Sequence, residues 1–225
     1  MKNEIAYDAY ENIVFVGEAK KGKDYFCPSC HEKLVFKNSG KTGPGSRCAH
    51  FSHIGGSDCN ESSLHAIFKH ETVKILRGCL NEEKPFVVEL ACRDCGVVHK
   101  LNLISGIISV EEELSLGTNC PRPDVALINE NKEVVAVMEI VVEHEPEEKA
   151  LTYYKKNNIL IFKYYPQEHD LNDMMPRLQV PVFSYHCYDC NVRAYRDSYR
   201  DYSRLRLPRR NWILERGKWK RKHRL

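Results

Sequence analysis

Short apolar runs separated by turn-forming residues fill the first part of the chain, which is the pattern of β-strands rather than helices. Residues 12–19 (NIVFVGEA) and 32–37 (EKLVFK) are two such runs. Residues 38–46 (NSGKTGPGS) have the Gly, Ser and Pro content of a loop. The pattern therefore predicts a small β module over residues 1–59.

The period changes to that of a helix over residues 59–80 (CNESSLHAIFKHETVKILRGCL). One apolar stripe runs along this segment and consists of Leu64, Ile67, Phe68, Ile75 and Leu76. Asp58 or Asn60 can cap the start of the helix, and Gly78 is expected to end it.

Strand patterns return beyond the helix. A hairpin is expected from residues 86–92 and 97–104. Three strands, a helix and a last strand follow at residues 106–114, 123–129, 133–142, 146–158 and 159–165. Hairpins pair strands antiparallel, whereas the helical crossover pairs the last two strands in parallel. The sequence thus predicts an α/β core over residues 60–165, a mixed sheet flanked by helices, followed by a C-terminal segment over residues 166–225.

Composition supports a packed interior, because 42% of the 225 residues are hydrophobic and 10% are aromatic. No apolar run approaches the roughly 20 residues needed to cross a bilayer. The N-terminal residues lack the apolar core of a signal peptide. We expect an intracellular, cytoplasmic protein (nuclear if the source is eukaryotic) with no membrane partner.

Six of the ten cysteines form three CxxC pairs, namely Cys27/Cys30, Cys92/Cys95 and Cys187/Cys190. In a reducing compartment this spacing favours zinc over disulfides. A disulfide-rich secreted protein is the alternative, and the missing export signal disfavours it.

Two structural zinc sites are predicted. The ligands of the first are Cys27, Cys30, His53 and Cys59. His50 is an alternative to His53, and Cys48 is a spare candidate. His53 is preferred because its short separation from Cys59 makes a compact second half of the site. Buried thiols without a metal are the competing interpretation.

The second zinc site would take four thiolates, those of Cys92, Cys95, Cys187 and Cys190. It would fasten the C-terminal segment to the hairpin at residues 86–104. Four protein ligands leave no open position, so both zinc ions are expected to be structural. Two independent redox or free cysteine pairs are the alternative.

Two carboxylates, Asp124 and Glu139, are candidates for a magnesium or manganese site. A hairpin with its turn near residues 129–132 places Asp124 opposite residue 137 or 139. Both faces of the strand at 133–142 are apolar, so an ionised Glu139 there is costly unless it is paired or bound to a metal. Oxygen ligands suit a hard cation such as Mg²⁺. A carboxylate solvated at a strand end is the competing interpretation for either residue.

Further charged residues could complete this site. Glu61, His65 and Lys69 lie at i, i+4 and i+8 and share one helix face, which a solvated surface would also explain. Glu61 could otherwise be an acid favoured by the helix dipole. Glu112 is the acid of residues 111–113 most expected to point inward.

The C-terminal segment is strongly basic. Residues 191–225 hold thirteen Arg or Lys against three acidic residues, so with a total of +3 the remainder carries about −7. Cations neutralise phosphates and aromatic rings stack on unpaired bases. The candidate nucleic-acid-binding residues are Arg209, Arg210, Lys218, Lys220 and Arg221. A merely solvated tail is the alternative.

The ordered runs FCPSCHEKLVFK, HFSH, CNESSLHAIFK, RPDVAL and VMEIVVEHEPEEKALTYYKKNNI resemble the competence protein CoiA-like family, over residues 5–165. That family resembles the PD-(D/E)xK nuclease superfamily with an added N-terminal zinc-binding module. The resemblance implies a restriction-endonuclease-like core that acts on DNA with Mg²⁺. It gives Asp124 the role of the PD aspartate, Glu139 that of the (D/E)xK acid, and Glu61 that of the helix glutamate.

The chain departs from the superfamily pattern at Val141, where a lysine is usual and CoiA-like sequences often have glutamine. Valine offers no donor, so the cation would come from another element. The candidates are Lys69, Lys149, Lys155 and Lys163, and we take Lys69 as the catalytic one.

Taken together, these features predict a zinc-stabilised, Mg²⁺-dependent DNA endonuclease. Single-stranded or branched DNA is among the expected substrates, and a homodimer is an option. A catalytically silent DNA-binding protein in recombination or in phage or defence processes is the second interpretation. A zinc-bearing protein-interaction scaffold is the third.

Overall fold

The computed structural model describes residues 4–37, 48–55, 59, 61–92 and 95–182, together with the backbone of two strands at 212–215 and 218–221. The chain divides into two compact units, Met1–Phe68 and Lys69–Leu225, each of which is described by itself. Among the described helices, none combines the length and apolar character required to span a bilayer.

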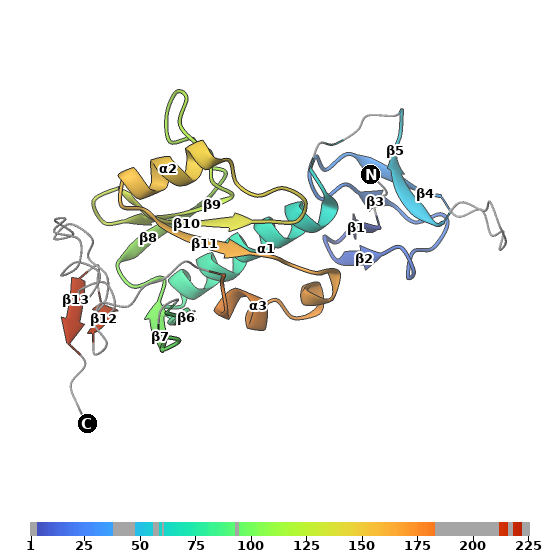
Figure 1. The fold of residues 1–225 in the computed structure, drawn as a ribbon. Coiled ribbons are helices and arrows are strands. Elements are labelled where there is room, and N and C mark those ends of the chain that lie inside the picture. Colours follow the sequence, from blue (N-terminus) through green and yellow to red (C-terminus); the bar gives the residue numbers. More distant parts are fainter. Residues whose placement is uncertain are drawn as a thin grey trace. The chain divides into compact units, whose positions relative to one another are not determined.

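The first unit contains a five-stranded antiparallel sheet with the strand order β2-β1-β3-β4-β5 (Figure 1). Its strands are β1 (Ile5–Asp8), β2 (Ile13–Phe15), β3 (Tyr25–Phe26), β4 (Lys33–Lys37) and β5 (His50–His53). The rings of Tyr25, Phe36 and Phe51 pack together at centroid distances of 5.0 to 6.4 Å and form the centre of its small core. The predicted strands at 12–19 and 32–37 are confirmed as β2 and β4.

Helix α1 (Ser63–Asn81) begins later, ends later and has a different cap than predicted. The side chain of Ser62 accepts a hydrogen bond from the His65 N–H at 3.2 Å, so Ser62 caps the start. The proposed caps Asp58 and Asn60 lie outside the described residues. The prediction that Gly78 ends the helix is wrong: the Glu82 N–H still donates to the Gly78 carbonyl at 3.0 Å. A glycine costs a helix only about 1 kcal/mol, which does not terminate it.

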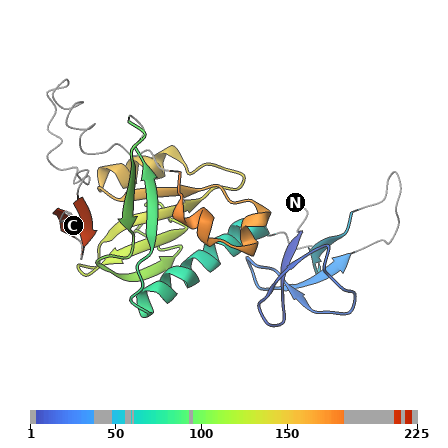
Figure 2. The ribbon, with the colours of Figure 1, turned by 90° about the horizontal axis from the view of Figure 1, so that it is seen from below.

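The second unit contains a four-stranded sheet with the order β11-β10-β9-β8, and the predicted mixed pairing is confirmed (Figure 1). Its strands are β8 (Ile107–Glu112), β9 (Val125–Asn129), β10 (Val134–Ile140) and β11 (Leu160–Tyr164). Neighbouring strands are antiparallel except β10 and β11, which are parallel and joined by helix α2 (Glu148–Lys156). Helix α2 covers one face of this sheet, and the part of α1 from Lys69 onward covers the other, as the two views agree (Figures 1 and 2).

A separate two-stranded hairpin consists of β6 (Val87–Ala91) and β7 (Val98–Asn102). It was predicted from the sequence, and Cys92 and Cys95 lie at its turn as expected. The strands β12 (Trp212–Glu215) and β13 (Lys218–Arg221) form another antiparallel hairpin in the basic segment.

Residues 166–182, which were assigned to the C-terminal segment, contain a 3-10 helix η1 (Glu168–Asn172) and a short helix α3 (Met175–Gln179). They continue the core: Val182 pairs with Lys163 at the edge of β11, and the Tyr164 hydroxyl donates to the Leu178 carbonyl at 3.2 Å. The amphipathic pattern of this short stretch is too brief to predict either helix from sequence.

Candidate metal centre and carboxylate site

Four metal-ligating side chains of the first unit converge on one point. Cys27 and Cys30 lie just after β3, His53 ends β5, and Cys59 lies between β5 and α1. Their ligand atoms all lie within 4.8 Å of one another. Because β4 links the CxxC turn to β5, the register that pairs Leu34 with His53 brings the two halves of the site together.

The separations of these atoms fit a tetrahedral zinc site. Cys27 Sγ lies 3.6 Å from Cys59 Sγ, and His53 Nε2 lies 3.3 Å from Cys30 Sγ and 3.5 Å from Cys59 Sγ. Zn–S and Zn–N bonds of about 2.3 and 2.0 Å give tetrahedron edges of about 3.8 Å between sulfurs and about 3.5 Å between nitrogen and sulfur. The donor set is therefore of the right kind and size for Zn²⁺.

Without a cation, this cluster disfavours thiolates. Burial raises the pKa of Cys59 to about 12, with the neighbouring thiols Cys30 and Cys27 adding to the effect. Burial likewise raises the pKa of Cys27. A bound divalent cation reverses this balance, because metal binding deprotonates cysteine ligands.

The structure separates the two histidine candidates. His53 is 9% exposed and belongs to the cluster, whereas His50 directs Nδ1 to the Cys48 carbonyl at 2.9 Å. The preference for His53 therefore agrees with the geometry. Among the described residues, the four-ligand cluster is the only such group of three or more metal-ligating side chains.

The second predicted zinc site is half within the described residues. Cys92 and Cys95 are placed at the β6–β7 turn, where the Gly96 N–H donates to the Cys92 carbonyl at 2.8 Å. Cys187 and Cys190 lie outside the described residues. The second zinc site therefore stays a prediction.

The acids of the second unit lie in one row across its sheet. Met138 pairs with Val125 between β10 and β9, so continuing this register sets Asp124 opposite Glu139. Glu112 pairs with Val125 between β8 and β9, and the Glu113 N–H donates to the Asp124 carbonyl at 3.0 Å. On the other side of β10, the register of the parallel strands sets Glu139 opposite Lys163 of β11. Of the two sequence-based registers for Asp124, opposite residue 137 or 139, the structure has the second.

Both carboxylates of this row are held by hydrogen bonds. Asp124 Oδ2 accepts the backbone N–H of Ile140 at 2.7 Å, and Glu139 Oε1 accepts the Tyr154 hydroxyl at 2.8 Å. Glu139 is 8% exposed and Tyr154 is fully buried. Burial and the charges of Glu139 and Asp124 raise the pKa of Tyr154, so its hydroxyl remains a donor at all ordinary pH values. Sequence reasoning missed Tyr154, although its spacing of four from the buried Ala150 was a usable signal.

Lys163 extends the row on β11. Its ammonium donates to Glu145 Oε2 at 2.7 Å, and the Tyr165 hydroxyl donates to Glu145 Oε1 at 2.6 Å. Glu145 follows β10 in the loop that leads to α2. A cation therefore stands one strand away from Glu139, although position 141 itself is a valine with 8% exposure.

The other predicted charged residues have different surroundings. The buried Lys69 ammonium is ion-paired with Glu113, which also pairs with Arg122 at 2.8 Å. Glu112 lies 3.9 Å from Lys69. In the first unit, Glu61 accepts hydrogen bonds from Ser29 at 2.9 Å and from His65 at 2.5 Å. Its role as a third acid stays a prediction.

Lys149 lies on the exposed face of α2 and pairs with Glu147, and Lys155 is exposed on the same helix. Of the basic-segment candidates, Arg209 and Arg210 lie outside the described residues. Lys218, Lys220 and Arg221 lie in strand β13, of which only the backbone is described.

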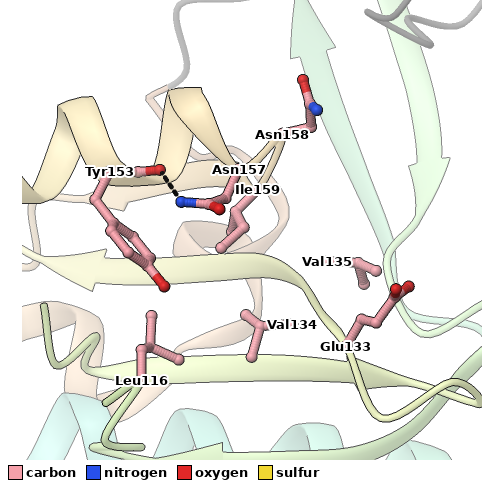
Figure 3. A pocket seen from close by; sticks show the side chains of 8 residues that line it. All are labelled: Leu116, Glu133, Val134, Val135, Tyr153, Asn157, Asn158 and Ile159. Carbon is pink, nitrogen blue, oxygen red and sulfur yellow. Dashed lines mark hydrogen bonds between the residues drawn. The ribbon is translucent and has the colours of Figure 1, made fainter. Parts of the chain in front are cut away.

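A separate cavity of about 440 Å³ lies near the start of β10, away from Glu139 along the strand. Figure 3 shows its apolar floor from Leu116, Val134 and Ile159, with Tyr153 and Asn157 beside it and Asn157 bonded to the Tyr153 carbonyl at 2.8 Å.

Comparison with known protein families identifies a match in the first unit. Residues 15–62 match the family model described as "Competence protein CoiA, N-terminal domain". The matched range contains all four residues of the Cys27, Cys30, His53 and Cys59 cluster. No curated protein and no solved structure matches the chain.

Proposed function

We propose that this chain is a CoiA-like, metal-dependent nuclease that hydrolyses DNA, starting from the match of residues 15–62 to the CoiA N-terminal domain. The zinc-binding first unit would be structural. The second unit would carry the chemistry on a core of the restriction-endonuclease type, a finer assignment that belongs to this proposal.

One observation carries the proposal: Asp124 and Glu139 are register neighbours on adjacent antiparallel strands, and Glu139 is buried. Together with burial, the charges of both carboxylates raise the pKa of the same hydroxyl, that of Tyr154. Two carboxylates held opposite each other on neighbouring strands offer the oxygen ligands that a hard divalent cation takes. The pair therefore supports a cation site.

Asp124 and Glu139 would hold Mg²⁺ or Mn²⁺, and their oxygen donors fit a hard cation that keeps several waters. When bound, such an ion supplies an activated water and stabilises charge on the phosphate. Tyr154 keeps the Glu139 carboxylate in place, and the Ile140 N–H does the same for Asp124.

The cation that Val141 cannot provide would come from Lys163. It is the pairing partner of Glu139, on the strand next to it, and adjacent strands lie about 4.8 Å apart. Lys69 on α1 and Lys149 on α2 are not strand neighbours of Glu139; they pair with Glu113 and Glu147. We therefore assign the charge-stabilising role to Lys163 in preference to these two.

The basic residues of the C-terminal segment would bind DNA. The proposed contacts to its phosphates are Arg209, Arg210, Lys218, Lys220 and Arg221. A catalytically silent DNA-binding protein is the second candidate function. The observation that favours it is Val141, which brings no donor to the strand of Glu139.

The deciding experiment is a cleavage assay on single-stranded, duplex and branched DNA with Mg²⁺ or Mn²⁺. Asp124→Asn and Glu139→Gln keep the side-chain shape and the hydrogen-bond acceptors, so they test the charges without removing Ile140 or Tyr154 contacts. Both are expected to abolish cleavage, whereas Glu133→Gln, an exposed acid on the same hairpin, keeps it. Absence of cleavage of all substrates by the unaltered chain rejects the nuclease proposal. Salt-dependent DNA binding would then support the silent form.

A further inference from the structure

Lys163, Tyr165 and Glu145 form a compact cluster on β11 and the loop before α2. The two oxygens of one carboxylate accept from two different donors, Lys163 Nζ at 2.7 Å and the Tyr165 hydroxyl at 2.6 Å. The contact with Lys163, followed by that with Tyr165, lowers the pKa of Glu145. The hydrogen bond to Glu145 raises the pKa of Tyr165 to about 12. Glu145 is therefore an anion at neutral pH and Tyr165 a neutral donor.

This cluster lies next to the carboxylate row in the register of the sheet. Lys163 belongs to β11 and Tyr165 directly follows this strand, and both side chains reach the Glu145 carboxylate. Lys163 is the register partner of Glu139 on the neighbouring strand. The Val141 N–H donates to the Tyr164 carbonyl at 2.8 Å, and this hydrogen bond holds the end of β11 beside the end of β10.

An ammonium and a hydroxyl that bind two oxygens of one anion are also suited to a phosphate group, which presents two or more oxygens on one centre. The occupant here is the chain's own carboxylate. The Glu145 side chain is 55% exposed, whereas the Lys163 side chain is 24% exposed. An ion pair so open to solvent contributes little stability, so an incoming anion can displace it at small cost.

We propose that Lys163 and Tyr165 form a phosphate-binding site for the nucleic-acid backbone, which Glu145 occupies until DNA displaces it. This inference rests on the proposed function for the identity of its ligand. The site would hold a backbone phosphate one strand away from Glu139. Glu145 would act as a competing anion that weakens binding of the polyanion.

The test is a double-mutant cycle on the full chain, with binding of a fluorescent short duplex DNA measured by anisotropy without Mg²⁺. Glu145→Gln should tighten binding about two- to fivefold, the range expected for an exposed ion pair. Lys163→Met should weaken it by a similar factor and reduce the salt slope by about one. In the double variant the gain from Glu145→Gln should disappear, because the donor it competed for is gone.

The matched control is the Glu147–Lys149 pair on α2, which is also exposed and ion-paired. Glu147→Gln changes the net charge equally but should tighten binding less than Glu145→Gln. If Glu145→Gln tightens binding equally with Lys163 present or absent, the effect is general repulsion and the proposal fails. Where the unaltered chain binds the duplex, the proposal also fails if Glu145→Gln leaves that binding unchanged.

Inorganic phosphate separates the failure of this site from the failure of the proposed function. Titration of the Glu145→Gln protein with phosphate should shift the Tyr165 ring signals in NMR, assigned with Tyr165→Phe, and should not do so when Lys163→Met is added. Phosphate binding without duplex binding would keep the site and reject the DNA-acting function. Duplex binding and cleavage without any Tyr165 shift would reject the site and keep the function.

Discussion

The Tyr154 hydroxyl, on helix α2, donates a hydrogen bond to Glu139 Oε1 at 2.8 Å, and both residues are buried. The helix that follows β10 thereby fixes the position of the acid at the centre of the proposed site. Tyr164 offers a matched comparison, because it is equally buried but donates to a neutral carbonyl, that of Leu178, at 3.2 Å.

We expect Tyr154→Phe to destabilise the chain by about 1.5–3 kcal/mol, since it removes a hydrogen bond to a charged group. Tyr164→Phe should cost about 1 kcal/mol, because its partner is neutral. Urea unfolding at neutral pH measures both changes. Tyr154→Phe should also reduce DNA cleavage while Tyr164→Phe does not. Equal costs for the two variants would mean that Glu139 is not held as a carboxylate.

One tightly bound zinc is predicted in the first unit from its four-ligand cluster. His53→Ala should lower the zinc content by about one ion per chain, as measured by elemental analysis after dialysis. His50→Ala is the control, because its ring contacts the Cys48 carbonyl rather than the cluster. Equal zinc loss in both variants, or none in either, would contradict the assignment. If the second site also forms, the unaltered chain contains about two zinc ions.

Lys163→Met should lower the DNA cleavage rate by about a hundredfold or more, the effect of removing one preorganised charge-stabilising group. Val141→Lys in the same chain should recover part of this loss, since it places an ammonium two residues after Glu139 on the same face. Lys149→Met should have little effect. Single-turnover cleavage at saturating protein separates this loss from weaker DNA binding. Failure of Val141→Lys to raise the rate, together with an unaffected Lys163→Met protein, would assign the role elsewhere.

Stability should depend on Asp170 at low pH. Burial alone would raise the pKa of this carboxyl, but hydrogen bonds from the Gln167 N–H and the Arg177 guanidinium outweigh it, and the pKa is lowered. The stabilisation is therefore fully present above the unfolded pKa of about 3.9 and is lost as pH falls through the folded value.

Asp170→Asn should accordingly cost about 1.5–3 kcal/mol at neutral pH, and the difference from the unaltered chain should shrink below about pH 4. Asp173→Asn is the control, because Asp173 is an exposed neighbour whose Oδ1 accepts the Met175 N–H at 3.2 Å. Urea unfolding over a pH series measures the effect. A cost that stays constant with pH would show that the carboxylate charge is not its source.

Local patterns were sufficient to predict most elements of the second unit and the ligand set of the first. The alternation in β10 and the short turn at residues 129–132 bring Asp124 and Glu139 together, because hairpin register follows from turn length. The position of Lys163 beside Glu139 is different. A parallel register depends on how a crossover helix packs, which no local pattern specifies.

Two other features escaped sequence reasoning for related reasons. Gly78 is a typical helix-stop signal, but a glycine costs a helix only about 1 kcal/mol and α1 continues through it to Asn81. The sequence favours Glu112 over Glu113 as the inward acid, whereas Glu113 is the one that pairs with both the buried Lys69 and Arg122. Charged networks formed across elements leave little trace in the order of residues.

The connection from β10 through α2 to β11 has a consequence for how such a site can change over time. The acid Glu139, its buried donor Tyr154 and the ammonium of Lys163 all belong to this single strand–helix–strand passage. A lysine lost from one strand can therefore be replaced by a lysine on the next strand without a change in the rest of the fold, because the same helix joins the two neighbouring strands.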